Sequence, residues 1–107
     1  MSRSIQVFVD MAVDPAKEQE MLHHFETVFR PAAKKFQGYL DVNLLKLRSV
    51  IVGSVPPGVN YRFELSYENE ELRQKWVTSD IHTQVWGAME KMLSSPNYIV
   101  LLFDVVT

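Results

Sequence analysis

The sequence predicts one α+β domain whose strands and helices follow the order β-α-β-β-α-β. Three observations predict this class. Short segments alternate apolar and polar residues as strands do, two longer segments repeat apolar residues every third or fourth position as helices do, and residues typical of turns separate them. The length of 107 residues suits a single domain, so we expect one over residues 1–107.

The first half of the chain predicts a strand, a helix and a second strand. Residues 5–11 are rich in β-forming side chains. Asp14 then provides an N-cap and Pro15 the first helical position, and the apolar residues that follow recur at helical spacing. Gly38 ends the helix. Residues 39–48 alternate around leucine and valine and predict the second strand.

The second half predicts a turn, a strand, a helix and a last strand. Residues 49–59 contain glycine and proline and must turn, yet their valines and isoleucine make them unusually apolar for a solvated loop. Residues 61–67 alternate apolar with polar residues and predict a strand with one apolar face. Asn69 caps the second helix, which ends at residues 95–97, and residues 98–106 form the last strand.

Each helical segment contains residues that are expected to interrupt it. Pro31 has no N–H to donate to the carbonyl of Thr27, so the first segment should kink or restart near Arg30. In the second segment, Ser79 and Asp80 form a local cap within the apolar periodicity. We therefore expect a kink or a break in both.

The order of elements predicts a sheet with one uncovered face. Each helical segment joins two parallel strands, and such crossovers are right-handed, so both helices pack on one face of a four-stranded antiparallel sheet. The last strand nevertheless has apolar side chains on both sides, with Ile99, Leu101, Phe103 and Val105 opposite Tyr98, Val100 and Leu102. A strand of this kind is normally covered on both faces.

A second copy of the chain is the expected cover for the open face. Two-fold homodimers are the commonest oligomers, and an interface of about 800 Å² per partner suffices for stable association. The apolar residues 50–59 are expected to add an arm across this interface. The alternative is an interaction domain whose open face binds a different protein.

Composition excludes several classes of function. The net charge is −2, with 11 basic and 13 acidic residues and no basic stripe, so we expect no nucleic-acid partner. The chain has no cysteine, which rules out disulfides, thiol nucleophiles and thiolate metal sites. No two histidines have a metal-ligand spacing beside a carboxylate, and we expect neither a metal nor another cofactor. Residues 1–6 lack the apolar core of a signal peptide and no stretch is long enough to span a bilayer, so we expect a cytoplasmic protein without membrane contact.

Two short motifs resemble those of a known family. In residues 67–80 an aromatic residue ends the third strand and Trp76 follows nine positions later; Trp76, Ser79 and His82 form a Trp-x-x-Ser pattern followed by histidine. Residues 36–39 resemble a Pro-Gly-Phe-like turn after the first helix, with glutamine in place of proline. With the element order of nearly the whole chain, these motifs resemble the dimeric α/β-barrel superfamily and its antibiotic-biosynthesis-monooxygenase-like (ABM-like) group. The resemblance implies a ferredoxin-like fold and a dimeric α/β barrel.

Two activities of this group bear on function. Its cofactor-free monooxygenases oxidise polyaromatic phenols with O₂ in a pocket between sheet and helices, with a tryptophan on the second helix, and Trp76 matches that position. Its haem-degrading members have an axial histidine about ten residues beyond that tryptophan, where this chain has Trp86, which cannot bind iron. Their strand-one asparagine falls at Val9 or Asp10, and neither is asparagine.

The resemblance therefore implies a small-molecule-binding protein that oxidises an aromatic or polyketide-like substrate without a cofactor. The first alternative is a non-catalytic ligand-binding or regulatory barrel for an apolar molecule, whose cavity would lack a polar group of perturbed pKa. The second, disfavoured by Trp86, is a haem-binding or haem-degrading protein. The fold does not decide between them, because one architecture can host many unrelated activities.

Four candidates would shape the pocket or accept a proton. Trp76 and Trp86 lie ten residues apart, which is about 80° around an unbroken helix, so both can touch one broad cavity. His82 or Asp10 would accept the phenolic proton. An imidazole titrates in the range that this task needs, and Asp10 interrupts an apolar strand where it would face a cavity.

Two further candidates would bind the substrate. Asn43 would orient it, and Tyr61 would supply a phenol at the pocket mouth or at the interface. Every candidate also has an ordinary structural interpretation. The tryptophans and Tyr61 would pack in the core, His82 would be a half-buried helix residue, Asp10 an edge or turn residue, and Asn43 part of the solvent side of a strand.

Overall fold

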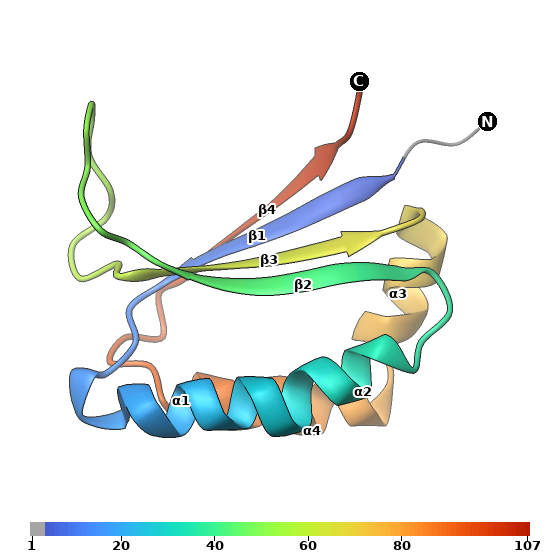
Figure 1. Ribbon diagram of the computed structural model, residues 1–107, viewed down its shortest axis with the longest axis horizontal. Helices are drawn as coiled ribbons and strands as arrows, with labels where there is room; N and C mark the ends of the chain where they lie inside the picture. The colour runs from blue at the N-terminus through green and yellow to red at the C-terminus, as the bar shows by residue number, and fades with distance from the viewer. Residues whose placement is uncertain (1–3) are drawn as a thin grey trace.

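The computed structural model describes residues 4–107, which form one antiparallel sheet with helices on one face (Figure 1). The strands are β1 (Ile5–Met11), β2 (Tyr39–Lys46), β3 (Tyr61–Tyr67) and β4 (Ile99–Asp104), in the spatial order β2-β3-β1-β4. β1 pairs with both β3 and β4, and β3 also pairs with β2. The predicted α+β, ferredoxin-like arrangement is confirmed; the second and last strands are shorter than predicted.

The first helical segment runs through η1 (Pro15–Lys17), α1 (Glu18–His24), η2 (Phe25–Phe29) and α2 (Arg30–Lys34). The side chain of Asp14 caps it by accepting a hydrogen bond from the N–H of Ala16 at 2.9 Å. η2 is a π-helical turn, in which the N–H of Arg30 donates to the carbonyl of Phe25. The missing N–H of Pro31 accounts for it, because the ladder loses a bond there and the backbone widens. The predicted restart near Arg30 is confirmed.

The second helical segment is divided into α3 (Glu70–Val77) and α4 (Asp80–Glu90), as predicted. Ser79 lies between them in an extended conformation, with φ −78° and ψ 154°. Its Oγ accepts a hydrogen bond from the N–H of His82 at 3.1 Å and donates one to the carbonyl of Trp76 at 2.7 Å. α3 and α4 therefore meet at an angle (Figure 1). No helix within residues 4–107 has both the length and the apolar character needed to cross a bilayer.

The hydrophobic core lies between the helices and the sheet face that they cover. Aromatic rings pack edge to face in its centre, where the Phe29 centroid lies 5.2 Å from that of Phe63 and 5.8 Å from that of Trp76. At the end of α2, Gly38 has φ 94°, and a Cβ at this position would lie 2.7 Å from the Cδ1 of Leu72. Only glycine suits both the backbone angle and the close approach.

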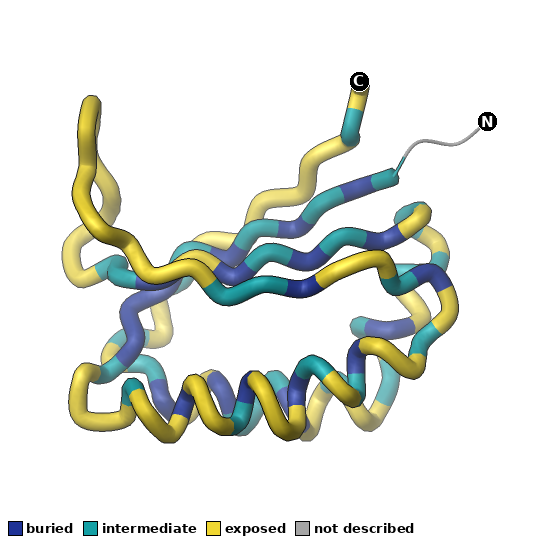
Figure 2. The backbone as a smooth tube through the Cα atoms, in the orientation of Figure 1, coloured by how far each residue is buried: buried dark blue, intermediate teal, exposed yellow. Residues whose placement is uncertain are grey.

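The other face of the sheet has no helix on it. Its apolar half follows β4 and the middle of β1, and the rest of this face is polar. The register places Phe8, Ile99, Leu101 and Phe103 on the apolar half and Gln6, Asp10, Asp41, Asn43, Arg62, Glu64 and Ser66 on the polar part. All of β4 is exposed (Figure 2). The prediction of a last strand that is apolar on both sides and uncovered within one chain is confirmed.

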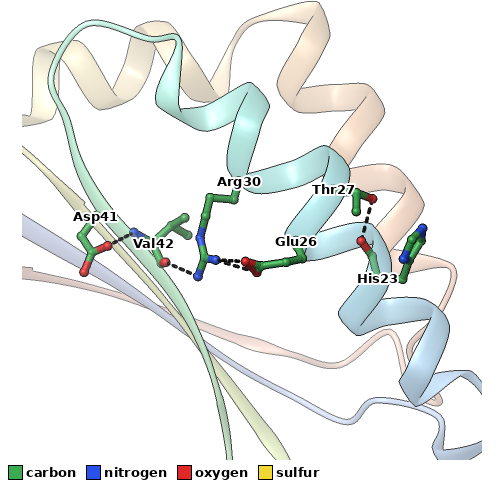
Figure 3. A network of polar contacts seen from close by, with 6 residues as sticks. All are labelled: His23, Glu26, Thr27, Arg30, Asp41 and Val42. Atoms are coloured by element: carbon green, nitrogen blue, oxygen red, sulfur yellow. Dashed lines mark hydrogen bonds and ion pairs between the residues drawn. The ribbon is translucent and has the colours of Figure 1, made fainter.

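The outer edge of β2 is capped by side chains at Val42 (Figure 3). The N–H of Val42 donates to Oδ1 of Asp41 at 2.9 Å, and its carbonyl accepts from Nη2 of Arg30 at 3.2 Å. Arg30 is itself held by an ion pair with Glu26 and by the ring of Phe25, whose centroid lies 5.0 Å from the guanidinium carbon. Both backbone groups of an edge residue are thus used within the chain, which blocks strand addition at this position.

Residues 48–59, called the arm below, connect β2 to β3 and stand away from the sheet on the side opposite the helices (Figure 1). Their base is fixed, because the N–H of Leu47 donates to the carbonyl of Asn60 at 2.8 Å, and the Asn60 amide bonds both the N–H and the carbonyl of Val13, at 2.7 and 2.9 Å. At the tip, Ile51 and Val52 are 92% and 91% exposed. The apolar tip of the arm therefore has almost no cover from its own chain.

Candidate functional site

A cavity of about 330 Å³ lies between the sheet and the angle formed by α3 and α4. Its walls come from the helix-facing side of β1 and β3, from η2, from α3 and α4, and from the start of β4. Most of these walls are aliphatic or aromatic. The charged or titratable side chains among them are those of Arg73, His82 and Tyr98. A largely apolar cavity with a few convergent polar groups is the usual form of a small-molecule site.

His82 is placed in this cavity by the break between α3 and α4. It lies in the first turn of α4, where its backbone N–H is held by Ser79. The indole of Trp76 meets the imidazole edge to face with centroids 5.0 Å apart, and that of Trp86 is nearly parallel to it at 6.5 Å. Burial lowers the pKa of His82, and the positive charge of Arg73 lowers it further. Both effects favour the neutral form of the imidazole, which is the form that can accept a proton.

Arg73 brings a fixed positive charge to the same cavity. Its Nε and Nη2 donate to the two carboxylate oxygens of Glu70 at 2.7 and 2.6 Å. These hydrogen bonds raise the pKa of Arg73 and lower that of Glu70, so both stay charged. Gln74 also donates to Glu70, at 2.7 Å. Sequence reasoning missed Arg73, although a Glu–Arg pair three residues apart beside Trp76 was the available signal.

A short chain of hydrogen bonds fixes the ring of Trp86. Its Nε1–H donates to the hydroxyl of Tyr98 at 3.4 Å, and that hydroxyl donates to a carboxylate oxygen of Glu90 at 2.9 Å. The two rings also meet edge to face at 5.7 Å. Tyr98 was expected only as part of the last strand; the structure places it in the cavity wall.

The sequence-predicted site residues divide into two groups. Trp76, His82 and Trp86 lie together in the cavity wall. Asp10 lies on the open face, on the other side of the sheet, where its carboxylate pairs with Arg62 through contacts of 2.6 and 2.9 Å. Val9, not Asp10, faces the cavity, because successive residues of a strand point to opposite sides. Asp10 therefore has no access to a proton on a ligand beside His82.

Asn43 and Tyr61 also lie outside the cavity. Asn43 is on the open face of β2, where its amide donates to Asp41 at 3.0 Å. Tyr61 begins β3 at the far end of the sheet, and its hydroxyl donates to Glu18 at 2.6 Å. Burial and this carboxylate raise the pKa of Tyr61 to about 12. Sequence patterns alone could not separate these residues from the cavity, because their placement depends on the sheet register.

A second hollow, of about 480 Å³, lies under the arm on the open face. Asp10, Tyr61 and Arg62 line it together with apolar arm residues. It is separated from the His82 cavity by the sheet itself. Within residues 4–107, no three His, Cys, Asp or Glu side chains are grouped as metal ligands would be.

Comparison with known proteins identifies the architecture. No family profile matches the chain, and no curated protein matches it in sequence. Among solved structures, a candidate antibiotic biosynthesis monooxygenase from Caulobacter crescentus matches with a TM-score of 0.79 at 19% identity, over 99% of this chain and 92% of the other. A second candidate of the same kind, from Nitrosomonas europaea, matches with a TM-score of 0.76 at 7% identity, over 99% and 93%. The chain has the fold of the ABM-like proteins.

A third structural match is described as dimeric. A dimeric ferredoxin-like protein of unknown function from Jannaschia has a TM-score of 0.78 at 10% identity, and the alignment covers 95% of this chain and 99% of the other. The resemblance inferred from the two sequence motifs is thus confirmed for the fold. A shared fold does not determine the chemistry, because one architecture hosts many unrelated activities.

Proposed function

We propose that this ABM-like chain is a small-molecule-binding enzyme that oxidises an aromatic or polyketide-like substrate with O₂ and without a cofactor. The observation that carries the proposal is a histidine, His82, held between two indoles in a largely apolar cavity. The flat walls formed by Trp76 and Trp86 suit a planar aromatic ring, and the imidazole is the group that accepts its proton.

The proposed reaction begins with transfer of the substrate's acidic proton to His82. An anthrone-type substrate becomes its anion, and this anion supplies the electrons that reduce O₂. One oxygen atom enters the substrate as the new carbonyl, and the other leaves as water together with the two hydrogens of the oxidised carbon. Atoms and electrons balance between anthrone plus O₂ and anthraquinone plus water.

Arg73 is proposed to stabilise the substrate anion. Its charge lies in the cavity wall, and its pairing with Glu70 keeps the guanidinium in one orientation. In a largely apolar cavity, a nearby cation favours the deprotonated form of a bound phenol or enol. Arg73 thus acts on the same step as His82: the imidazole accepts the proton, and the guanidinium stabilises the anion that remains.

The non-catalytic alternative fits the cavity less well. A protein that only stores or senses an apolar molecule would have a cavity without a polar group of perturbed pKa. Here burial and Arg73 lower the pKa of His82, and perturbed groups of this kind gather at catalytic sites. We therefore favour the enzyme.

The proposed functional unit is a homodimer that is joined through the open sheet face. The apolar half of that face supports this arrangement; there the ring centroids of Phe8 and Phe103 lie 5.3 Å apart. The Jannaschia protein, which is described as dimeric, supports it as well. A two-fold interface there would place the apolar half of one subunit near the apolar half of the other and remove both from water.

An oxygen electrode tests the enzyme proposal. Purified protein is incubated with anthrone and related hydroxylated polycyclic aromatics, and O₂ uptake is compared in the parent, in His82→Gln and in His23→Gln, an exposed histidine of α1 that serves as the matched control. We expect uptake to fall by about a hundredfold or more in His82→Gln, the usual effect of removing a general base, and to persist in His23→Gln. Absence of uptake across the panel, or full activity of His82→Gln, contradicts the proposal.

A further inference from the structure

β4 forms one wall of the His82 cavity and is also the most exposed strand of the sheet. On the open face, Leu101 and Phe103 are 38% and 50% exposed. On the helix-facing side, Val100 and Leu102 are 55% and 50% exposed, and Val100 lines the cavity. The cavity is therefore open along the β4 edge within a single chain.

Packing two open faces together covers only half of this strand. Residues of a strand alternate between its faces, so sheet-on-sheet packing reaches Leu101 and Phe103 but not Val100 or Leu102. Those two residues pair with Val9 and Val7 and thus lie on the side of the helices. A segment that passes around the edge of the sheet is needed to cover them.

The arm has the reach and the composition for this role. It leaves the sheet on the open-face side (Figure 1), and the six residues 48–53, if extended, span about 20 Å at about 3.3 Å per residue. Packed sheets lie about 10 Å apart, so an arm of this length extends beyond the mid-plane of a partner sheet. Its tip residues Ile51 and Val52 are almost fully exposed in one chain. The tip thus arrives on the helix-facing side of the partner.

The two edges of the sheet are not equivalent targets. At the β2 edge, Asp41 and Arg30 occupy the backbone groups of Val42. At the β4 edge, none of the side-chain hydrogen bonds found within residues 4–107 involves a residue of β4. The β4 edge is also apolar on both faces, which matches the apolar tip of the arm.

We infer that the arm of each subunit wraps around the β4 edge of its partner and closes the partner's His82 cavity. Ile51 and Val52 then lie on Val100 and Leu102, so each cavity is complete only in the dimer. The inference rests on the proposed homodimer and goes beyond it, because it assigns the arm to the partner's cavity. Closure excludes water from the imidazole and from a bound anion.

Engineered disulfides test this contact directly, because the chain has no cysteine of its own. Ile51→Cys combined with Leu102→Cys is oxidised and run on a non-reducing gel beside each single-cysteine variant. The control combines Ile51→Cys with Val28→Cys, which lies exposed on η2. A disulfide needs Cα atoms within roughly 7 Å. We expect a covalent species of twice the 12.4 kDa chain for the 51–102 pair alone.

A second variant reports on closure without a cross-link. Ile51→Ser with Val52→Ser should increase acrylamide quenching of the two tryptophans, while light scattering follows the oligomeric state. The inference is overturned if light scattering shows a dimer, quenching is unchanged, and residues 51 and 102 form no cross-link between subunits, whether they form no disulfide at all or one inside a single chain. That result leaves the proposed function intact. A monomer by light scattering overturns the dimer and the inference together, and loss of O₂ uptake in His82→Gln still tests the chemistry by itself.

Discussion

Removal of the Ser79 hydroxyl is expected to destabilise the break that positions His82. Ser79→Ala removes the bond that its Oγ accepts from the N–H of His82 at 3.1 Å and the one it donates to the carbonyl of Trp76 at 2.7 Å. The second loss is small, because the N–H of Ser79 still donates to the same carbonyl at 3.1 Å. The first is the loss of an N-cap, which typically costs about 1 kcal/mol. We expect the free energy of unfolding to fall by about 1 kcal/mol and the melting temperature by about 4 °C.

The assay is equilibrium unfolding in guanidinium chloride, followed by the fluorescence of Trp76 and Trp86, which flank the break in sequence. All variants are compared at one protein concentration, since association adds to stability. Ser54→Ala, at an exposed position of the arm, is the matched control for the same chemical change. Ser79→Asp retains a capping oxygen and should unfold close to the parent.

The comparison can refute the argument. If Ser79→Ala and Ser54→Ala unfold at the same midpoint, the cap is not what holds the start of α4. If Ser79→Asp loses as much stability as Ser79→Ala, the capping bond is not the main contribution. The larger contribution then comes from the bond that the hydroxyl donates to the carbonyl of Trp76.

Four further predictions concern charge and backbone. His82 should titrate by NMR below the ordinary value of 6.5, and Arg73→Met should raise that pKa, because the neighbouring cation is removed; a value at or above 6.5 in the parent contradicts the cavity environment. Since the folded-state pKa of His82 is depressed, the unfolded chain binds more protons, and stability should fall as the pH drops from the ordinary histidine value toward the folded one, a loss that His82→Gln removes. Gly38→Ala should cost at least about 1 kcal/mol in urea unfolding, because alanine pays for φ 94° and for a Cβ 2.7 Å from a neighbouring side chain, whereas Gly87→Ala, with open space around it, should not. Asn60→Ala should cost about 2 kcal/mol, because both backbone groups of buried Val13 lose their partner; a change within error of an exposed Asn97→Ala control would contradict this.

Much of the fold could be read from local signals. Asp14 and Ser79 predict where their helices begin, because a capping side chain bonds backbone groups two or three residues away. Pro31 predicts an interruption near Arg30, because its missing N–H acts within one helical turn; the structure shows that this interruption is a π-helical turn. The apolar alternation of residues 61–67 fixed the third strand at its observed bounds. Each of these effects operates between near neighbours and needs no knowledge of the rest of the chain.

The candidate site could be read only in part. Trp76, His82 and Trp86 lie within one helical segment, so their common placement follows from short-range geometry together with the break at Ser79. Asp10 could not be assigned, because a one-residue difference in register moves a strand residue from one side of a sheet to the other. Arg73 was overlooked because an ion pair on a helix is usually a surface feature.

The sequence by itself determined which segments are strands and helices, where they are interrupted, and that one sheet face lacks cover. Only the tertiary structure decided that Val9 faces the cavity and Asp10 the open face, that Tyr98 meets Trp86, and that Arg73 lies close enough to lower the pKa of His82. The reason is that secondary structure follows from interactions a few residues apart. A cavity, in contrast, is formed where η2, α3, α4 and three strands converge, and those distances are fixed only when the whole core packs.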